Sequence, residues 1–184
     1  PDIANYKPDL NSLNVTDKWL LHRVNEFVKQ ADEHYSSYKN HFVVKEFETL
    51  IDDLSNFYIR INRRRFWKSE NKQDQMDAYY CLYYALKTVT SVLAPIVPFM
   101  TEYIWQNMVR EVEKDEAEFI LAGGFPTYKA EWNFGDVLDR ANVARDIITV
   151  AQRLRNENQI KVKQPLKTMY LMLGDKEKLA VKDF

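Results

Sequence analysis

The segment Ser55-Asn-Phe-Tyr-Ile-Arg-Ile-Asn-Arg-Arg-Arg-Phe-Trp-Lys68 ends a long helical pattern and changes its character. Upstream of the arginines, apolar residues recur every three or four positions and form one stripe of a helix. The stripe consists of Phe47, Leu50, Ile51, Leu54, Tyr58 and Ile61. Arg60, Arg64 and Lys68 are spaced four apart, so they share one face, where like charges repel by a few tenths of a kcal/mol per pair. This pattern predicts a helix over residues 41–67 that ends in a cationic cluster.

Two interpretations fit this cluster, which consists of Arg60, Arg63, Arg64, Arg65, Trp67 and Lys68. Cations near a helix C-terminus interact favourably with the helix dipole, so the arginines could form an ordinary solvated face. Arginine also binds phosphate through paired hydrogen bonds, and flat rings stack on bases, which favours an RNA-binding surface. Asp52, Asp53 and Asn56 could offset the repulsion from within the chain, and an external polyanion could do so from outside.

Length and composition describe a helical protein with one sizeable core. The chain has 184 residues but only four glycines and six prolines, too few for a strand-and-turn protein of this size. A net charge of −1 argues against a protein that coats DNA, so any nucleic acid must bind to a local patch. The single cysteine, Cys81, lies in an apolar helical pattern and is expected to be a buried hydrophobic residue. A lone cysteine fits the reducing cytosol and predicts a cytoplasmic location.

No stretch has the pattern of a signal peptide or a membrane span. The most apolar segment, residues 78–100, is interrupted by Lys87, Pro95 and Pro98, which indicates a helix in the core of a bundle rather than in a bilayer. The sequence begins with Pro1 and stops at Phe184 within a pattern, so we expect a piece of a longer protein.

Five amphipathic segments predict an all-α fold, an antiparallel bundle of about five helices. The first two are residues 16–35 and 41–67. The third lies between the polar turn 71–74 and Pro95, and the last two are residues 98–113 and 136–158. Thr16 is the expected N-cap of the first helix, and Pro98 suits the first turn of the fourth. Residues 168–173 read as a strand that begins a small C-terminal α/β element. We expect three parts: a linker (1–15), the bundle (16–158) and a link to a further subdomain (159–184).

The apolar spacing also predicts which side chains point inward. In the first helix these are Leu20, Val24, Phe27, Val28 and Ala31. In the fourth helix they are Phe99, Tyr103, Ile104, Met108 and Val112. In the fifth they are Leu138, Ala141, Ala144, Ile147 or Ile148, Ala151 and Leu154.

No catalytic constellation is recognisable. His22, His34 and His41 occur singly, and the last two flank an expected turn, so their spacing argues against a shared metal site. The sequence contains no Cys-x-x-Cys pair, no glycine-rich phosphate loop and no nucleophile elbow. We therefore predict a binding module with no catalytic residue and no metal ligand.

Four stretches together resemble one family, the anticodon-binding domains of the class I aminoacyl-tRNA synthetases for isoleucine, valine, leucine and methionine. The most specific is Leu93-Ala-Pro-Ile-Val-Pro-Phe-Met-Thr-Glu-Tyr-Ile-Trp105, which is similar to the family's turn Leu-x-Pro-x-x-Pro-Phe-x-x-Glu-x-x-Trp. Asp17-Lys-Trp-Leu-Leu-His-Arg-Val-Asn25 resembles the family's opening helix. The segment 55–67, and Arg153-Leu-Arg-Asn156 with Ile160-Lys-Val-Lys-Gln-Pro-Leu166, resemble the isoleucyl branch. The resemblance covers residues 15–173, but Ile61-Asn62 departs from the Arg and small residue usual there.

The resemblance implies binding of isoleucine tRNA (tRNA-Ile) through its anticodon arm. It also implies a larger ligase that uses ATP with magnesium, with zinc as a further candidate cofactor, and whose catalytic domain precedes this bundle in the same chain. The His-Ile-Gly-His and Lys-Met-Ser-Lys-Ser signatures of that catalytic domain are missing here, as is the editing domain. Two alternatives remain: a helical docking or structural module without RNA contact, and a subunit of a metabolic enzyme with its site in the loop 114–134.

Topology predicts where the RNA lies. In an antiparallel bundle, the corner at 35–42 and the proline turn at 95–98 share one end, opposite the N-terminus near residue 15. By the resemblance the catalytic domain joins at the N-terminal end, so the anticodon bases are expected at the opposite corner. The expected anticodon-binding residues are Arg23, Tyr35, Tyr38, His41, Phe42, Arg153, Arg155, Lys161 and Lys163. The arginine cluster is then expected to contact the tRNA backbone or the catalytic domain.

Overall fold

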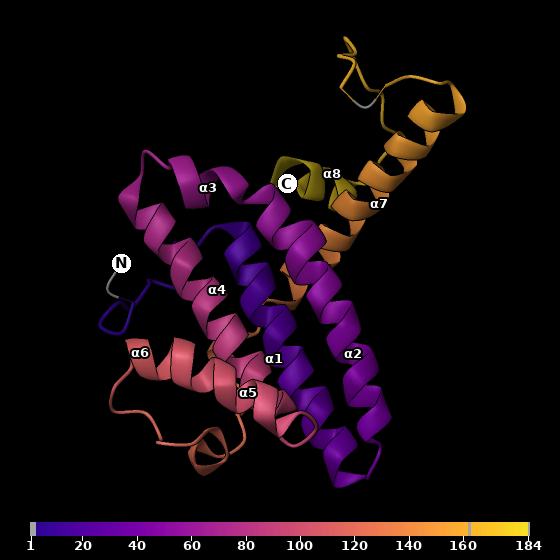
Figure 1. The fold of residues 1–184 in the computed structure, drawn as a ribbon. Helices are drawn as coiled ribbons and strands as arrows, with labels where there is room; N and C mark the ends of the chain where they lie inside the picture. Colours follow the sequence, from indigo (N-terminus) through magenta and orange to yellow (C-terminus); the bar gives the residue numbers. More distant parts are fainter. Residues whose placement is uncertain (1–2, 162, 184) are drawn as a thin grey trace. The chain divides into compact units, whose positions relative to one another are not determined.

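A computed structural model describes residues 3–161 and 163–183, and α-helices dominate it (Figure 1). The predicted all-α class is therefore confirmed. The chain divides into two compact units, residues 1–133 and 134–184, which we describe separately. Within the described residues, no helix is both long enough and apolar enough to cross a bilayer.

Four helical stretches and the loop that follows them form the first unit. Helix α1 (Val15–Ser36) packs against α2 (Asn40–Asp52) and α4 (Lys72–Leu93). The α2 stretch continues through the π-helical segment η1 (Asp53–Ile59) into α3 (Arg63–Lys68). A fourth stretch runs through α5 (Pro98–Ile104), the π-helical segment η2 (Trp105–Val109) and α6 (Arg110–Val112), and then a loop contains the short 3₁₀ helices η3 (Ile120–Gly123) and η4 (Ala130–Trp132).

The core of this unit follows the predicted periodicity with a few exceptions. All five inward positions predicted for α1 are buried, and Trp19 packs edge-on against Phe57 with ring centroids 4.7 Å apart. Cys81 is buried as expected. Ile61, predicted to lie inside, is 46% exposed because it follows the π-helical segment, which shifts the helical register.

The ends of the helices also test the predictions. Asn14, not Thr16, caps α1, because its side chain accepts a hydrogen bond from the Thr16 backbone N–H at 2.9 Å. The Thr16 hydroxyl instead donates to the Asn62 side chain at 3.0 Å, which ties α1 to the start of α3. Pro98 lies in the first turn of α5, as predicted.

The predicted pairing of helix ends is confirmed within the first unit. The Tyr35 hydroxyl at the end of α1 donates to the Val92 carbonyl near the end of α4 at 2.9 Å. At the other end, Arg65 of α3 bonds to Asp17 of α1 and Asp74 of α4. Since α1 has 22 residues, the two ends lie about 33 Å apart.

The second unit contains α7 (Gly135–Glu157) packed against α8 (Asp175–Asp183). The predicted strand at 168–173 is wrong: the segment is irregular, and among the described residues no other extended segment pairs with it, as a strand requires. Ala141 and Ala144 are buried as predicted, whereas Leu154 is 50% exposed. The sequence-based boundary at residue 158 and the placement of the end of α7 beside the corner stay predictions.

Candidate nucleic-acid interface

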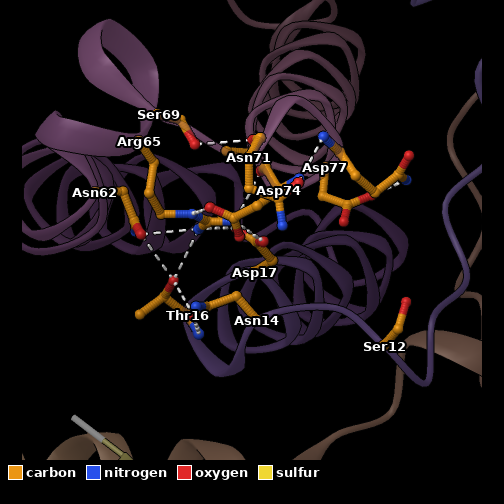
Figure 2. Close-up of polar contacts among 12 residues, drawn as sticks. Ser12, Asn14, Thr16, Asp17, Asn62, Arg65, Ser69, Asn71, Asp74 and Asp77 are labelled. Atoms are coloured by element: carbon orange, nitrogen blue, oxygen red, sulfur yellow. Dashed lines mark hydrogen bonds and ion pairs between the residues drawn. The ribbon is translucent and has the colours of Figure 1, made fainter.

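Arg65 is the centre of a polar network at the N-terminal end of the first unit (Figure 2). Its guanidinium donates to both carboxylate oxygens of Asp17, at 2.9 and 2.6 Å, and to both of Asp74, at 2.9 and 2.8 Å. It also donates to the Asn62 side-chain oxygen at 2.8 Å. Planar guanidinium groups match two carboxylates in this way, so one side chain joins α1, α3 and α4.

Burial makes this network sensitive to the loss of any member. The Asp17 side chain is 0% exposed and also accepts a hydrogen bond from the Tyr58 hydroxyl at 2.7 Å. Burial raises the pKa of Asp17, and its bonds to Arg65 and Tyr58 act in the opposite direction. Burial lowers the pKa of Arg65, but its bonds to Asp17 and Asp74 outweigh that effect and raise it. Arg65 is thus an intramolecular ion-pair partner, and the expectation that it contacts tRNA or another domain stays a prediction that this network disfavours.

The remaining members of the cluster form what we call the arginine surface: Arg60, Arg63, Arg64, Trp67 and Lys68. All five side chains are exposed. Among the described residues none of the four cations has an ion-pair partner, and Arg63 lies 5.7 Å from the centre of the Trp67 ring. Trp67 itself is 69% exposed.

The acidic residues that could have neutralised this surface are engaged elsewhere. Asp53 pairs with Arg23 at 3.0 Å. Asp52 accepts a hydrogen bond from the Asn56 amide at 2.6 Å. The repulsion among the stacked cations is therefore not offset by these neighbours, which favours an external polyanion.

The corner between α1 and α2 is less available than the sequence suggested. Tyr35 is half-buried and packs edge-on against Phe125, and burial raises its pKa to about 12. Phe42 is stacked within the chain, with its ring centroid 5.2 Å from His34 and 4.3 Å from His41. Of the four predicted corner residues, only Tyr38 presents a ring without an intramolecular ring contact among the described residues.

Tyr38 ends α1 in a left-handed conformation. Its φ is 56°, and its N–H bonds to the Tyr35 carbonyl at 3.1 Å while the Lys39 N–H bonds to that of His34 at 2.8 Å. This is a Schellman motif, in which glycine normally occupies the left-handed position. The tyrosine ring is 92% exposed, so its packing does not offset the free-energy cost of the strained backbone.

We predict that Tyr38→Gly raises the free energy of unfolding by about 1 kcal/mol, because glycine adopts positive φ without strain. Tyr38→Ala removes the same ring but keeps the Cβ, so its stability should stay near that of the parent chain. Urea unfolding of the two variants separates strain from ring packing. A glycine variant no more stable than the alanine variant would contradict this assignment.

The other predicted anticodon contacts are mostly engaged. Arg23 is held by Asp53. In the second unit, Arg153 lies 3.7 Å from Glu157, and Arg155 donates to the carbonyls of residues 161 and 164 at 3.1 and 2.9 Å. Lys161 and Lys163 are exposed. No set of three or more metal-ligating side chains gathers among the described residues.

The sequence interpretation missed an apolar surface on α5. Phe99 is 92% exposed, Met100 63% and Tyr103 67%, although the spacing of Phe99 and Tyr103 predicted that both lie inside. Thr101 and Trp105 occupy the buried face of this stretch instead. Four-residue spacing identifies one face of a helix but not which face is covered, so no signal in the sequence could have settled the point.

Known proteins match the chain over most of its length. The family model described as "Anticodon-binding domain of tRNA ligase" matches residues 17–170. The isoleucine–tRNA ligase of Clostridium tetani is 35% identical over 176 residues, which cover 94% of this chain. Those of Thermoplasma acidophilum and Chlamydia caviae are 37% and 36% identical and cover 89% and 97% of it. The chain spans 15% to 17% of the length of these three relatives.

Proposed function

Because the chain belongs to the family of anticodon-binding domains of tRNA ligases, we propose that it recognises the anticodon arm of tRNA-Ile. We propose further that it is part of an isoleucine–tRNA ligase, whose catalytic domain joins isoleucine to the tRNA in the cytoplasm. That reaction consumes ATP, held with magnesium by residues outside these 184. Zinc, if the longer protein holds it, would also bind outside them.

The arginine surface carries this proposal. It combines four exposed cations that have no ion-pair partner among the described residues with one exposed indole ring. Phosphate contacts supply most of the affinity of proteins for RNA, and a neutral chain needs such a local patch to obtain it. The same surface offers a ring on which an unpaired base can stack.

We propose that Trp67 is the ring that stacks on an anticodon base. Arg63 lies near this ring, and arginine beside an aromatic ring is a common arrangement for binding single-stranded RNA. The rival is the corner, where the sequence placed the bases and where Tyr38 keeps a free ring. The two rings lie at opposite ends of the first unit, so mutations can distinguish them.

A titration of the chain with tRNA-Ile transcripts tests this assignment. We expect binding that weakens with salt and that is stronger for the native anticodon than for altered ones. Trp67→Ala should remove about 1–3 kcal/mol of the binding free energy, the contribution of one stacked base, and Tyr38→Ala should leave the affinity unchanged. If Tyr38→Ala weakens binding instead, the bases lie at the corner. If all transcripts bind equally, the chain contacts only the phosphate backbone and does not distinguish anticodons.

The apolar surface on α5 favours a second candidate function, a docking module. Phe99 at 92% exposure is unusual for a large apolar side chain, and such surfaces commonly bind other proteins. The same titration separates the two functions, because a docking module would not bind any transcript at low salt.

A further inference from the structure

The first unit contains a cavity of about 420 Å³ between α1, α4, η2 and the loop that follows α6. This volume is within the range of small-molecule sites. Four aromatic rings line it, those of Tyr84, Trp105, Phe125 and Trp132. Trp105 lies in a π-helical segment, a feature that often occurs at functional sites, and its indole N–H donates to the Ala117 carbonyl at 3.0 Å.

Ion pairs fix one wall of this cavity. The Lys87 ammonium lies 2.6 Å from a carboxylate oxygen of Glu113 and 2.6 Å from one of Glu116. These contacts join α4 to the start of the loop. Burial lowers the pKa of Lys87, but its bonds to Glu113 and Glu116 outweigh that effect and raise it. One ammonium is thus shared by two carboxylates, so this wall keeps a net negative charge.

Lys129, which also lines the cavity, has no ion-pair partner among the described residues. Its backbone is fixed by Asn25, which donates to its carbonyl and accepts from its N–H, both at 2.8 Å. Its ammonium lies 4.0 Å from the centre of the Trp132 ring and 5.6 Å from that of Tyr84. Among the described residues this ammonium forms no hydrogen bond or ion pair; the charges of Glu131 and Glu113 act on it at longer range, and burial lowers its pKa.

An ammonium group has three donors, and leaving them unsatisfied in a half-buried site is unfavourable. An anionic group of a ligand would supply the missing acceptor. A second negative charge would be repelled by Glu113 and Glu116 across the cavity and by the exposed Glu131, whose charge acts on Lys129. The four rings suit a flat aromatic group.

We propose that this cavity binds a small ligand that joins a flat aromatic ring to a single negative charge, with the charge at Lys129 and the ring against the aromatic wall. Two kinds of molecule share this chemistry: an aromatic monocarboxylate and a nucleotide that carries one phosphodiester. The proposal does not depend on the RNA-binding function, since the arginine surface does not line the cavity.

Fluorescence titration tests the proposal, because two of the four tryptophans line the cavity. The probes are adenosine 3′,5′-cyclic monophosphate, benzoate, adenosine and inorganic phosphate. We expect saturable binding of cyclic AMP or benzoate, at least tenfold tighter than adenosine or phosphate, and the better of the two identifies the source. Equal binding of adenosine and cyclic AMP with no binding of benzoate, or no saturable binding of any probe, would overturn the proposal.

Lys129→Met keeps an apolar stem beside Trp132 but removes the charge, and should weaken binding of the charged probe at least tenfold. Lys45→Met is the matched control, since Lys45 is exposed on α2 and outside the cavity. Urea unfolding checks that both variants fold. If Lys129→Met is unstable, Lys129→Arg takes its place and should retain binding. Retained binding in a folded Lys129→Met, or lost binding in a folded Lys129→Arg, contradicts the role of this charge.

Discussion

Replacing Arg65 with alanine is expected to lower the free energy of unfolding by about 3–5 kcal/mol, the usual cost of removing one partner from a buried ion pair. The variant would leave the Asp17 carboxyl group at 0% exposure without its cationic partner, with only the Tyr58 hydroxyl and surrounding dipoles to stabilise a charge that burial already disfavours. It would also remove the only side chain that bonds to both Asp17 and Asp74 among the described residues. Urea unfolding followed by circular dichroism measures the loss.

Arg64→Ala is the matched control for this measurement. It removes the same side chain one position earlier, from a site that is exposed and unpaired among the described residues, so its stability should change by less than about 0.5 kcal/mol. A double variant, Asp17→Asn with Arg65→Ala, should recover part of the loss because it removes the buried charge that the single variant leaves behind. If Arg65→Ala lowers the free energy of unfolding by less than about 1 kcal/mol, water stabilises Asp17 nearly as well as the guanidinium does.

The sequence predicted the all-α class and the pairing of helix ends in the first unit because both follow from apolar spacing and turn residues. It could not separate Arg65 from Arg63 and Arg64. Successive helical residues are rotated by about 100°, so three neighbouring arginines point in three directions, and the partner that selects one of them is 48 positions away along the chain. Local patterns carry no information about such a contact.

The same limit explains the other errors. Residues 168–173 have the composition of a strand, but a strand also needs a hydrogen-bonded neighbour, which composition does not supply. Phe99 and Tyr103 have core spacing, yet only the packed structure reveals that Trp105 faces inward in their place. At the corner, composition could not show that the Phe42 ring stacks on His34 and lies tilted against His41, and its role in anticodon binding stays a prediction.

Replacing Arg60, Arg63 and Arg64 together with glutamine is expected to weaken tRNA binding on the order of 100-fold at 0.1 M salt. Each phosphate contact releases counterions worth roughly five- to tenfold in affinity at that salt concentration. The plot of log affinity against log salt should become shallower by about 2–3, since three cations no longer displace counterions. Affinity should fall about equally for all anticodons, because phosphate contacts position the RNA without reading its sequence. Arg65 must be left in place, because its loss would destabilise the domain and lower the affinity without removing a phosphate contact.

The control for this variant removes the same number of positive charges elsewhere. Lys29, Lys39 and Lys45 are exposed on α1, at the corner and on α2, and their replacement with glutamine changes the net charge equally. If the arginine surface binds the backbone, the lysine variant should keep nearly the full salt dependence and most of the affinity. An equal loss in both variants would mean that the RNA responds only to the overall charge. A larger loss in the lysine variant would place the RNA near the corner, since Lys39 adjoins Tyr38 there, and would assign the arginine surface to contact with another domain.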